Sequence, residues 1–144
     1  MSNRPFLDHG RTFLDCTANT DLSSFQWKAV QVLDSLTAQA PATGTDGLTG
    51  TVGILETAPS LAGENCRVCI FGITKAVAGS IAIAAGERFV FAVNNTEPGL
   101  LYNVSSAATY AASTGIYYVG GQVLESTVDS QLVSVFLNPQ IVHV

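Results

Sequence analysis

The chain has 144 residues, which is the length of a single domain. Only 12% of the residues are charged, against about 25% in an average soluble domain. The net charge of −5, with six Lys and Arg in all, argues against a nucleic-acid partner, because so few cations cannot neutralise many phosphates. The mean hydropathy of +0.34 leaves two interpretations: the chain enters a membrane, or it buries apolar surface against other subunits.

The membrane interpretation fails on the length of the apolar runs. A spanning helix needs about 20 apolar residues, but Lys75 and Glu87 enclose a run of only residues 76–86, which contains Gly79 and Ser80. Residues 1–16 combine two arginines with two aspartates and hold no long apolar run, so no signal peptide is predicted. We therefore expect a soluble, non-secreted protein with no membrane partner, whose apolar surface is used in subunit contacts.

Residues 1–22 are predicted to form an N-terminal arm. The segment is polar and contains Pro5 and Gly10, but it carries two apolar pairs, namely Phe6, Leu7, Phe13 and Leu14. Such pairs are typical of an arm that docks on another surface, and we take these four residues as candidate contacts to a partner. The alternative is a terminal strand that folds back onto its own domain.

Residues 23–144 are predicted to form a single β domain. The segment FQWKAVQVL, from Phe25, is rich in β-branched and aromatic residues, which favours a strand. Residues 36–50, with one proline and three glycines, predict a loop. Residues 51–56 (TVGILE) predict the next strand and residues 57–65 a turn. Residues 66–78 (CRVCIFGITKAVA) predict a pair of strands or one long strand, with a bulge or bend at Gly72.

The C-terminal half continues this alternation. In residues 79–93 (GSIAIAAGERFVFAV), Gly79 and Gly86 predict turns, and the alternating residues around Ile81 and Ile83 and around Phe89 and Phe91 predict short strands. Residues 94–103 predict a turn, and residues 104–115 a loop or an irregular strand. Residues 116–126 and 131–138 predict the closing strands, with a bulge at Gly120 and Gly121. Strands about ten residues apart, separated by Gly or Pro, are typical of small sandwiches and barrels. The predicted fold class is therefore all-β, a small β-barrel or sandwich with an extended N-terminal arm.

Cys66 and Cys69 have the C-x-x-C spacing of metal and redox sites. The other candidate metal ligands, Cys16, His9 and His143, lie near the chain ends. In a strand, positions i and i+3 point to opposite faces, so the two sulfur atoms would diverge. We therefore predict buried core thiols and no bound metal or cofactor, with metal or redox chemistry as the alternative.

The sequence offers no motif for catalysis. Neither histidine lies in a recognisable nucleophile–base pattern, the carboxylates are scattered beside turn residues, and GTDGLTG lacks the lysine of a phosphate-binding loop. We therefore expect no enzymatic activity.

Lys75 has two interpretations: an exposed or edge-strand charge that discourages aggregation, or a lysine that pairs with a carboxylate across a subunit contact.

The segment GTVGILETAPSLAGENCRVCIFGITKAVAGSIAIAAGERF resembles the capsid decoration proteins of tailed phages, also called structural cement proteins. The matching positions are Gly50, Val52, Gly53, Ile54, Leu55, Pro59, Gly63, Glu64, Gly72, Lys75, Ala76, Ala78, Gly79, Ile81, Ala85 and Gly86. The ending YYVGGQVLESTVDSQLVSVFLN is similar to the last two strands of that family, so the resemblance covers residues 48–138. Two segments depart from the family pattern: the long N-terminus, and an insert over residues 94–115 that contains Tyr102 and Tyr110.

The resemblance implies a non-enzymatic β domain on the outer capsid surface of a mature phage head, made in the host cytoplasm. Such a protein bridges neighbouring copies of the major capsid protein and is often a homotrimer; a dimer is the other possibility. The predicted contact residues to the capsid or to other subunits are Phe6, Leu7, Phe13, Leu14, Lys75, Tyr102 and Tyr110.

Two other functions fit the same sequence. The first is another virion structural component, such as a head fibre base or a tail or joining protein, which would share the all-β, low-charge character. The second is a small β-barrel ligand-binding module, whose cavity would use aromatic side chains. The aromatic candidates for such a cavity are Trp27, Tyr102, Tyr110, Tyr117 and Tyr118.

Overall fold

The computed structural model of the protein describes residues 10–41, 51–93, 98–106 and 116–143. Within these ranges the chain forms nine strands and two short 3-10 helices, so the all-β prediction is confirmed. The strands are β1 (Thr12–Ala18), β2 (Ala29–Val32), β3 (Thr37–Gln39), β4 (Thr51–Leu55), β5 (Asn65–Val77), β6 (Arg88–Phe91), β7 (Leu101–Asn103), β8 (Ile116–Val123) and β9 (Leu132–His143). The 3-10 helices are η1 (Ser23–Phe25) and η2 (Val104–Ser106).

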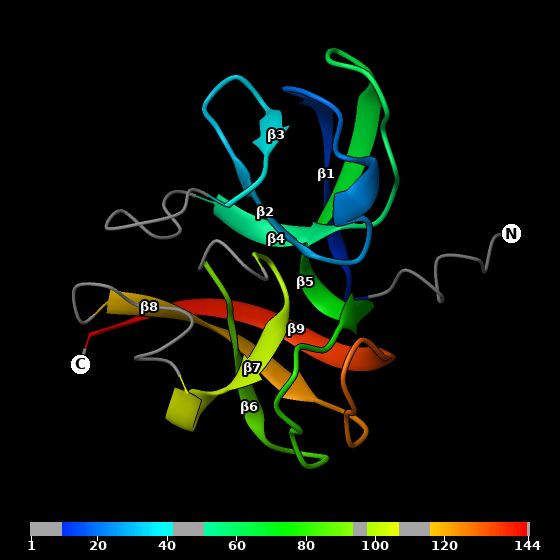
Figure 1. The fold of residues 1–144 in the computed structure, drawn as a ribbon. Coiled ribbons are helices and arrows are strands. Elements are labelled where there is room, and N and C mark those ends of the chain that lie inside the picture. The colour runs from blue at the N-terminus through cyan, green and yellow to red at the C-terminus, as the bar shows by residue number, and fades with distance from the viewer. Residues whose placement is uncertain (1–9, 42–50, 94–97, 107–115, 144) are drawn as a thin grey trace, which may run out of the picture.

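The first half of the chain forms a small closed barrel, drawn in the upper half of Figure 1. Its strands follow the order β1-β3-β2-β4-β5, and β1 pairs with β5 to close the ring. The β1–β3 pairing is parallel and all the others are antiparallel. Closure leaves fewer free strand edges than an open sheet would.

Strand β5 passes from the barrel into a second sheet. Its residues 65–71 pair with β1, whereas residues 72–77 pair with residues 132–137 of β9. The strand changes partners at Gly72, whose φ of +106° suits glycine and where a Cβ would lie 2.8 Å from the carbonyl oxygen of Gly10. The predicted bend at Gly72 is confirmed, and the segment is one long strand rather than a pair.

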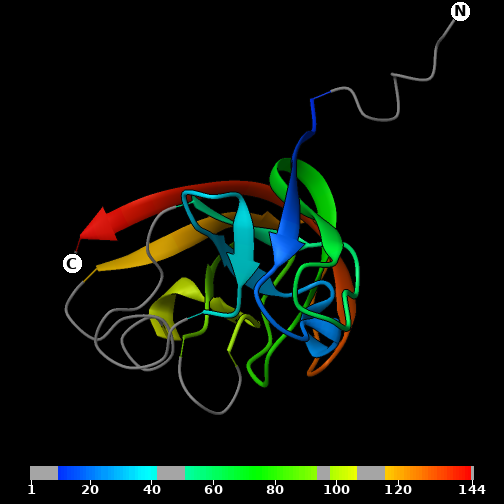
Figure 2. The same cartoon turned by 90° about the horizontal axis from the view of Figure 1, so that it is seen from above.

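The second sheet has the order β5-β9-β8-β6-β7. A parallel bridge between Ala78 and Leu101 brings β7 back beside the end of β5. The β8–β9 pairing shifts register between Val119 and Gly121, so the bulge predicted at the two glycines is also confirmed. Seen from above, β8 and β9 curve together along one side of the molecule (Figure 2).

The hydrophobic core lies in two main layers. One fills the barrel and includes Leu22, Val30, Leu55 and Val68. The other lies between the barrel and the second sheet: Ala29, Val52 and Ile54 on β2 and β4 pack with the inner face of that sheet. The inner-face residues are Ala76, Phe89, Phe91, Val123, Val133, Val135 and Leu137. Each large side chain buried there stabilises the fold by roughly 1.5–3 kcal/mol.

Strand β2 begins later than predicted. Ser23–Phe25 form η1, and Trp27 has a φ of +65°, which is not an extended conformation. The backbone of Trp27 is held on both sides: its N–H donates to the carbonyl oxygen of Leu55 at 2.6 Å, and its own carbonyl accepts from the N–H of Val77 at 3.0 Å. These tertiary hydrogen bonds override the strand propensity of the segment.

Three further local predictions were wrong. Thr37–Gln39, expected within a loop, forms β3, and Leu101–Asn103, expected within a turn, forms β7. The alternating residues 81–84, expected as a strand, form none; Ile83 is instead held by Thr127, whose Oγ1 accepts from the Ile83 N–H at 2.8 Å and whose N–H donates to the Ile83 carbonyl at 2.9 Å.

The predicted N-terminal arm is only partly described. Thr12–Ala18 form β1, which closes the barrel, so this part of residues 1–22 follows the folded-back alternative. Residues 1–9 lie outside the described residues, and for them the arm stays a prediction.

Candidate functional site

The predicted contact residues are not gathered at one place. Phe6, Leu7 and Tyr110 lie outside the described residues. Phe13 and Leu14 are half-buried and pack against the protein's own two core layers. The ring of Phe13 also lies beneath two guanidinium groups, with the Cζ atoms of Arg11 and Arg67 at 4.3 and 4.7 Å from its centroid.

Tyr102 requires a correction, because its side chain is fully buried and is not available as a surface contact in this fold. The ring occupies the space beside Gly79, where a Cβ would lie 2.4 Å from the ring carbon Cζ. Its hydroxyl lies 3.3 Å from Ser80 Oγ and accepts from the Ser80 N–H at 3.4 Å. Tyr102 is therefore a core residue that lets β7 pack closely on the end of β5.

Lys75 is exposed and lies on the outer face of the second sheet. Its Nζ donates to Ser134 Oγ at 2.9 Å, across the β5–β9 pairing. Among the described residues, Lys75 therefore fits the first of its two interpretations, that of an exposed strand residue. Its neighbours on the same face, however, were not predicted from the sequence.

The outer face is defined by the strand registers. Residues directly opposite one another on neighbouring strands point to the same side. One row pairs Lys75 with Ser134, and the backbone of Leu124 bonds to Ser134 from the other side. Val77, opposite Leu132, and the pair Val90 and Val119 also point to this side, but they pack in a third core cluster. The other eight residues, called the outer face below, are Ile73, Lys75, Arg88, Gln122, Leu124, Leu132, Ser134 and Phe136.

Large apolar side chains are exposed across this face. Ile73 is 57% exposed, Leu124 47% and Leu132 43%, and Phe71, 38% exposed, adjoins them at the end of the barrel half of β5. Phe71 packs edge-on against Phe136, with ring centroids 5.5 Å apart. The exposed apolar area is on the order of 400 Å², the size of the largest, often functional, patch on a typical monomer.

The charges of the outer face are all positive. Lys75 and Arg88 are two of the six cations of a chain whose net charge is −5, and none of the eight residues is an Asp or Glu. Glu125 lies at the rim next to Leu124, where its Oε1 accepts from the Ser134 N–H at 3.0 Å. The outer face is thus basic and apolar on an acidic protein.

Two shallow depressions flank the apolar row formed by Ile73 and Phe136. The first, of about 300 Å³, is lined by Arg11, Trp27, Glu56, Ile73, Thr74, Lys75 and Ser134. The second, of about 250 Å³, is lined by Arg88, Val119, Gly121, Gln122, Phe136, Asn138 and Gln140. Each depression therefore contains one of the two cations of the outer face.

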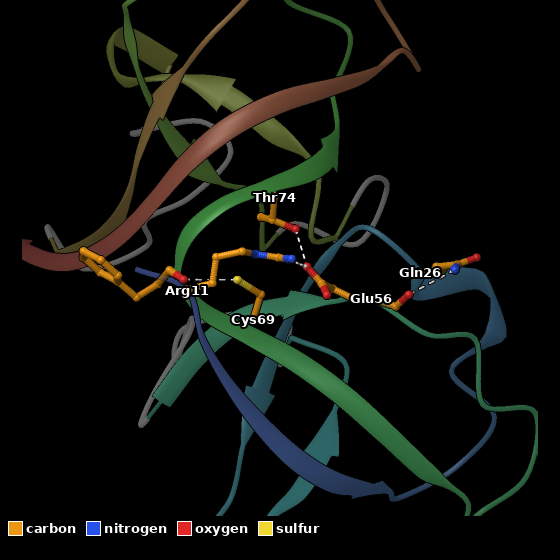
Figure 3. Close-up of polar contacts among 6 residues, drawn as sticks. Arg11, Gln26, Glu56, Cys69 and Thr74 are labelled. Carbon is orange, nitrogen blue, oxygen red and sulfur yellow. Dashed lines mark hydrogen bonds and ion pairs between the residues drawn. The ribbon is translucent and has the colours of Figure 1, made fainter. Parts of the chain in front are cut away.

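A partly buried polar cluster supports the first depression (Figure 3). Arg11, which precedes β1, donates from Nη2 to Glu56 Oε2 at 2.5 Å, and Thr74 of β5 donates from Oγ1 to the same oxygen at 2.6 Å. The backbone carbonyl of Glu56 accepts from Gln26 Nε2 at 3.1 Å. This cluster ties the end of β4 to both halves of the molecule, because Thr74 belongs to the second sheet.

The three cysteines are buried and free, as predicted. Cys66 packs in the barrel core and Cys69 in the core between barrel and sheet, so the two side chains of the C-x-x-C pair do diverge. Cys16 lies directly opposite Cys66. Burial raises the pKa of the Cys16 thiol to about 11, with smaller contributions from Cys66 and Asp15, and burial also raises the pKa of Cys66 and of Cys69. Raised pKa values keep the thiols neutral, which is unfavourable for nucleophilic or metal-binding roles.

These thiols give a prediction for the effect of pH. The pKa of a cysteine thiol is about 8.5 in the unfolded state. A thiol whose pKa is higher in the folded state makes its full contribution to the free energy of unfolding at pH values below about 8.5. The contribution of Cys16 should be lost as pH rises from about 8.5 through about 11. We expect urea midpoints to fall over this range, and to fall less steeply in Cys16→Ala. An equal slope in the two proteins would contradict the assignment.

The described residues contain no group of three or more His, Cys, Asp or Glu that could hold a metal ion. The same part of the chain has no helix with the length and hydropathy needed to cross a membrane. What its surface offers instead is the outer face, with two cations, a row of exposed apolar side chains and two depressions. Such an arrangement is suited to contact with another macromolecule.

Comparison with solved structures gives a similarity that extends over most of the chain. The fold is similar to a solved structure, the head fiber gp8.5 N base in bacteriophage phi29, with a TM-score of 0.50 and 15% sequence identity. The similarity covers 89% of this chain and 94% of that chain. No protein-family model matches the sequence, and no curated protein sequence does. The resemblance to structural cement proteins therefore stays a prediction, and what the comparison establishes is a fold shared with a head fibre base.

Proposed function

We propose that this chain is a structural component of a tailed-phage virion, carried on the outside of the head. The observation that carries the proposal is the fold similarity to a head fibre base, which extends over nearly the whole of both chains. This similarity favours the head fibre base among the alternatives considered from sequence. The structural cement function is the second candidate, and it rests on the sequence resemblance over residues 48–138.

The proposed function is binding rather than catalysis. Its partners would be the major capsid protein and further copies of this chain, as a trimer or a dimer, with no cofactor and no nucleic acid. The low charge content and the exposed apolar side chains of the outer face support a role in contacts. A protein that binds only the assembled shell stabilises that state by linkage, and many symmetric copies add to the effect through multivalency.

Co-sedimentation with phage heads tests this function. The probe is a preparation of mature, expanded heads from a mutant of the phage that encodes this chain, in which the gene has been deleted, so that the heads lack this protein. The purified protein is expected to pellet with these heads at a fixed number of copies per head. Protein that stays in the supernatant at all concentrations would contradict a place on the head.

The same heads distinguish the two candidates. A cement protein should raise the temperature at which the heads release their DNA, because it bridges capsid subunits. A fibre base should bind without an appreciable change in that temperature. Light scattering of the free protein would report whether it is a trimer, a dimer or a monomer before it binds.

A further inference from the structure

We infer that the outer face is the surface through which this protein docks on the head shell, and that the complementary surface there is acidic with an apolar centre. The inference rests on the proposed function and adds the docking surface and the chemistry of its partner. It starts from the sign of the charges: Lys75 and Arg88 lie on this face without an Asp or Glu among its other residues.

Charge complementarity selects the partner. A second copy placed face to face by a two-fold axis would bring Lys75 and Arg88 towards the same two cations, and like charges in contact are unfavourable. A partner with carboxylates is attracted instead, which raises the association rate and fixes orientation. The two cations are three strands apart on one sheet, roughly 15 Å, so the partner needs carboxylates at about that spacing.

The apolar row supplies the centre of the contact. Ile73 and Phe136 lie opposite one another between the two depressions, and Phe71 extends the row towards the barrel. An apolar centre with a charged rim is the usual arrangement of a protein–protein interface. The exposed apolar area on the order of 400 Å² is about half of the roughly 800 Å² that each partner buries in a standard interface.

The first depression is also preorganised. Its wall includes Trp27, held at a φ of +65° by backbone hydrogen bonds to Leu55 and Val77. Bulky residues in this backbone region are uncommon and cluster at binding sites. The Arg11–Glu56 ion pair fixes the adjacent side, which leaves Lys75 as the exposed cation among the lining residues. A carboxylate of the partner would enter here, next to Ile73.

The test compares two matched pairs of variants by co-sedimentation with the deleted-gene heads. Ile73→Ser is matched by Leu61→Ser, an apolar residue that is 69% exposed in the turn before β5. The double variant Lys75→Ser/Arg88→Ser is matched by Lys28→Ser/Arg67→Ser, which removes the same charge elsewhere. We expect each outer-face variant to bind heads roughly tenfold more weakly than the unmodified protein, and each control variant to bind within about twofold of it. The affinity of the outer-face charge variant should also lose most of its dependence on salt concentration.

The outcomes separate the inference from the proposed function. Unmodified protein that binds heads, with outer-face variants that bind equally well, overturns the inference and leaves the function standing. Unmodified protein that does not bind heads overturns the function. Light scattering of the protein that does not bind heads then decides what covers the face. An oligomer that Ile73→Ser dissociates shows that a second copy covers it, and a protein that is monomeric in every variant shows a face that binds neither heads nor a second copy. Both results overturn the acidic-partner assignment.

Discussion

Replacing Glu56 by alanine is expected to lower the free energy of unfolding by about 2–3 kcal/mol. One oxygen of this carboxylate accepts from Arg11 and from Thr74, at 2.5 and 2.6 Å. The side chain is only 11% exposed and that of Arg11 24%. Breaking a fully buried ion pair costs about 3–5 kcal/mol, because a charge is left without its counterion, and the partial exposure of Arg11 reduces that cost.

Urea denaturation would measure the change. Asp129→Ala is the matched control, since its carboxylate is exposed and accepts a hydrogen bond from Ser130 Oγ within its own turn; a change within about 0.5 kcal/mol is expected there. A double-mutant cycle with Arg11→Ala isolates the ion pair from the bond to Thr74. A Glu56→Ala protein as stable as the control would show that the cluster does not hold the two halves together.

This cluster illustrates how the two halves of the molecule are joined. β5 runs through both of them, and the core between barrel and sheet is formed from β2 and β4 on one side and the inner face of the second sheet on the other. The outer face is therefore backed by a continuous core rather than by a loop. A docking surface built on strands in this way is held more rigidly than one built on connecting segments.

Much of the fold could be predicted from local sequence. Alternating and β-branched residues identified β4 and β5, and glycines identified the bend at Gly72 and the bulge at Gly120 and Gly121. These features depend on the conformational preferences of single residues, which the sequence displays directly. The three-residue strand β3 and its parallel pairing with β1 depend on tertiary contacts and left no such pattern.

The outer face could not be predicted, because apolar residues occupy both sets of alternating positions. On β5, Ile73 points outward and Ala76 points inward. On β9, the adjacent apolar residues Phe136 and Leu137 likewise point to opposite faces of the sheet. A two-sided apolar strand is expected to be buried on both faces. The signal that could have identified the face was Lys75, the one charge among residues 68–86, and its register with Ser134 appears only in the folded chain.

The largest effect on stability is expected at the β8–β9 bulge, where Gly121→Ala should cost about 4 kcal/mol or more. The glycine has a φ of +139°, and a Cβ built on it would lie 1.9 Å from the carbonyl oxygen of Phe136. That oxygen belongs to the backbone of β9, which is paired with β5 on its other edge and has little freedom to move. Overpacking of this kind is among the few causes of losses above 4 kcal/mol.

Gly86→Ala is the control that separates close approach from backbone strain. Gly86 also has a positive φ, +88°, but no atom lies within 4 Å of its built Cβ. Its replacement should cost only the strain of a left-handed alanine, about 1–2 kcal/mol, and leave a soluble protein with a thermal midpoint lowered by several degrees. Gly121→Ala should instead give little soluble protein or a much larger drop. Equal midpoints for the two variants would mean that β9 moves to accept the methyl group, and that the bulge is not the fixed edge of the second depression.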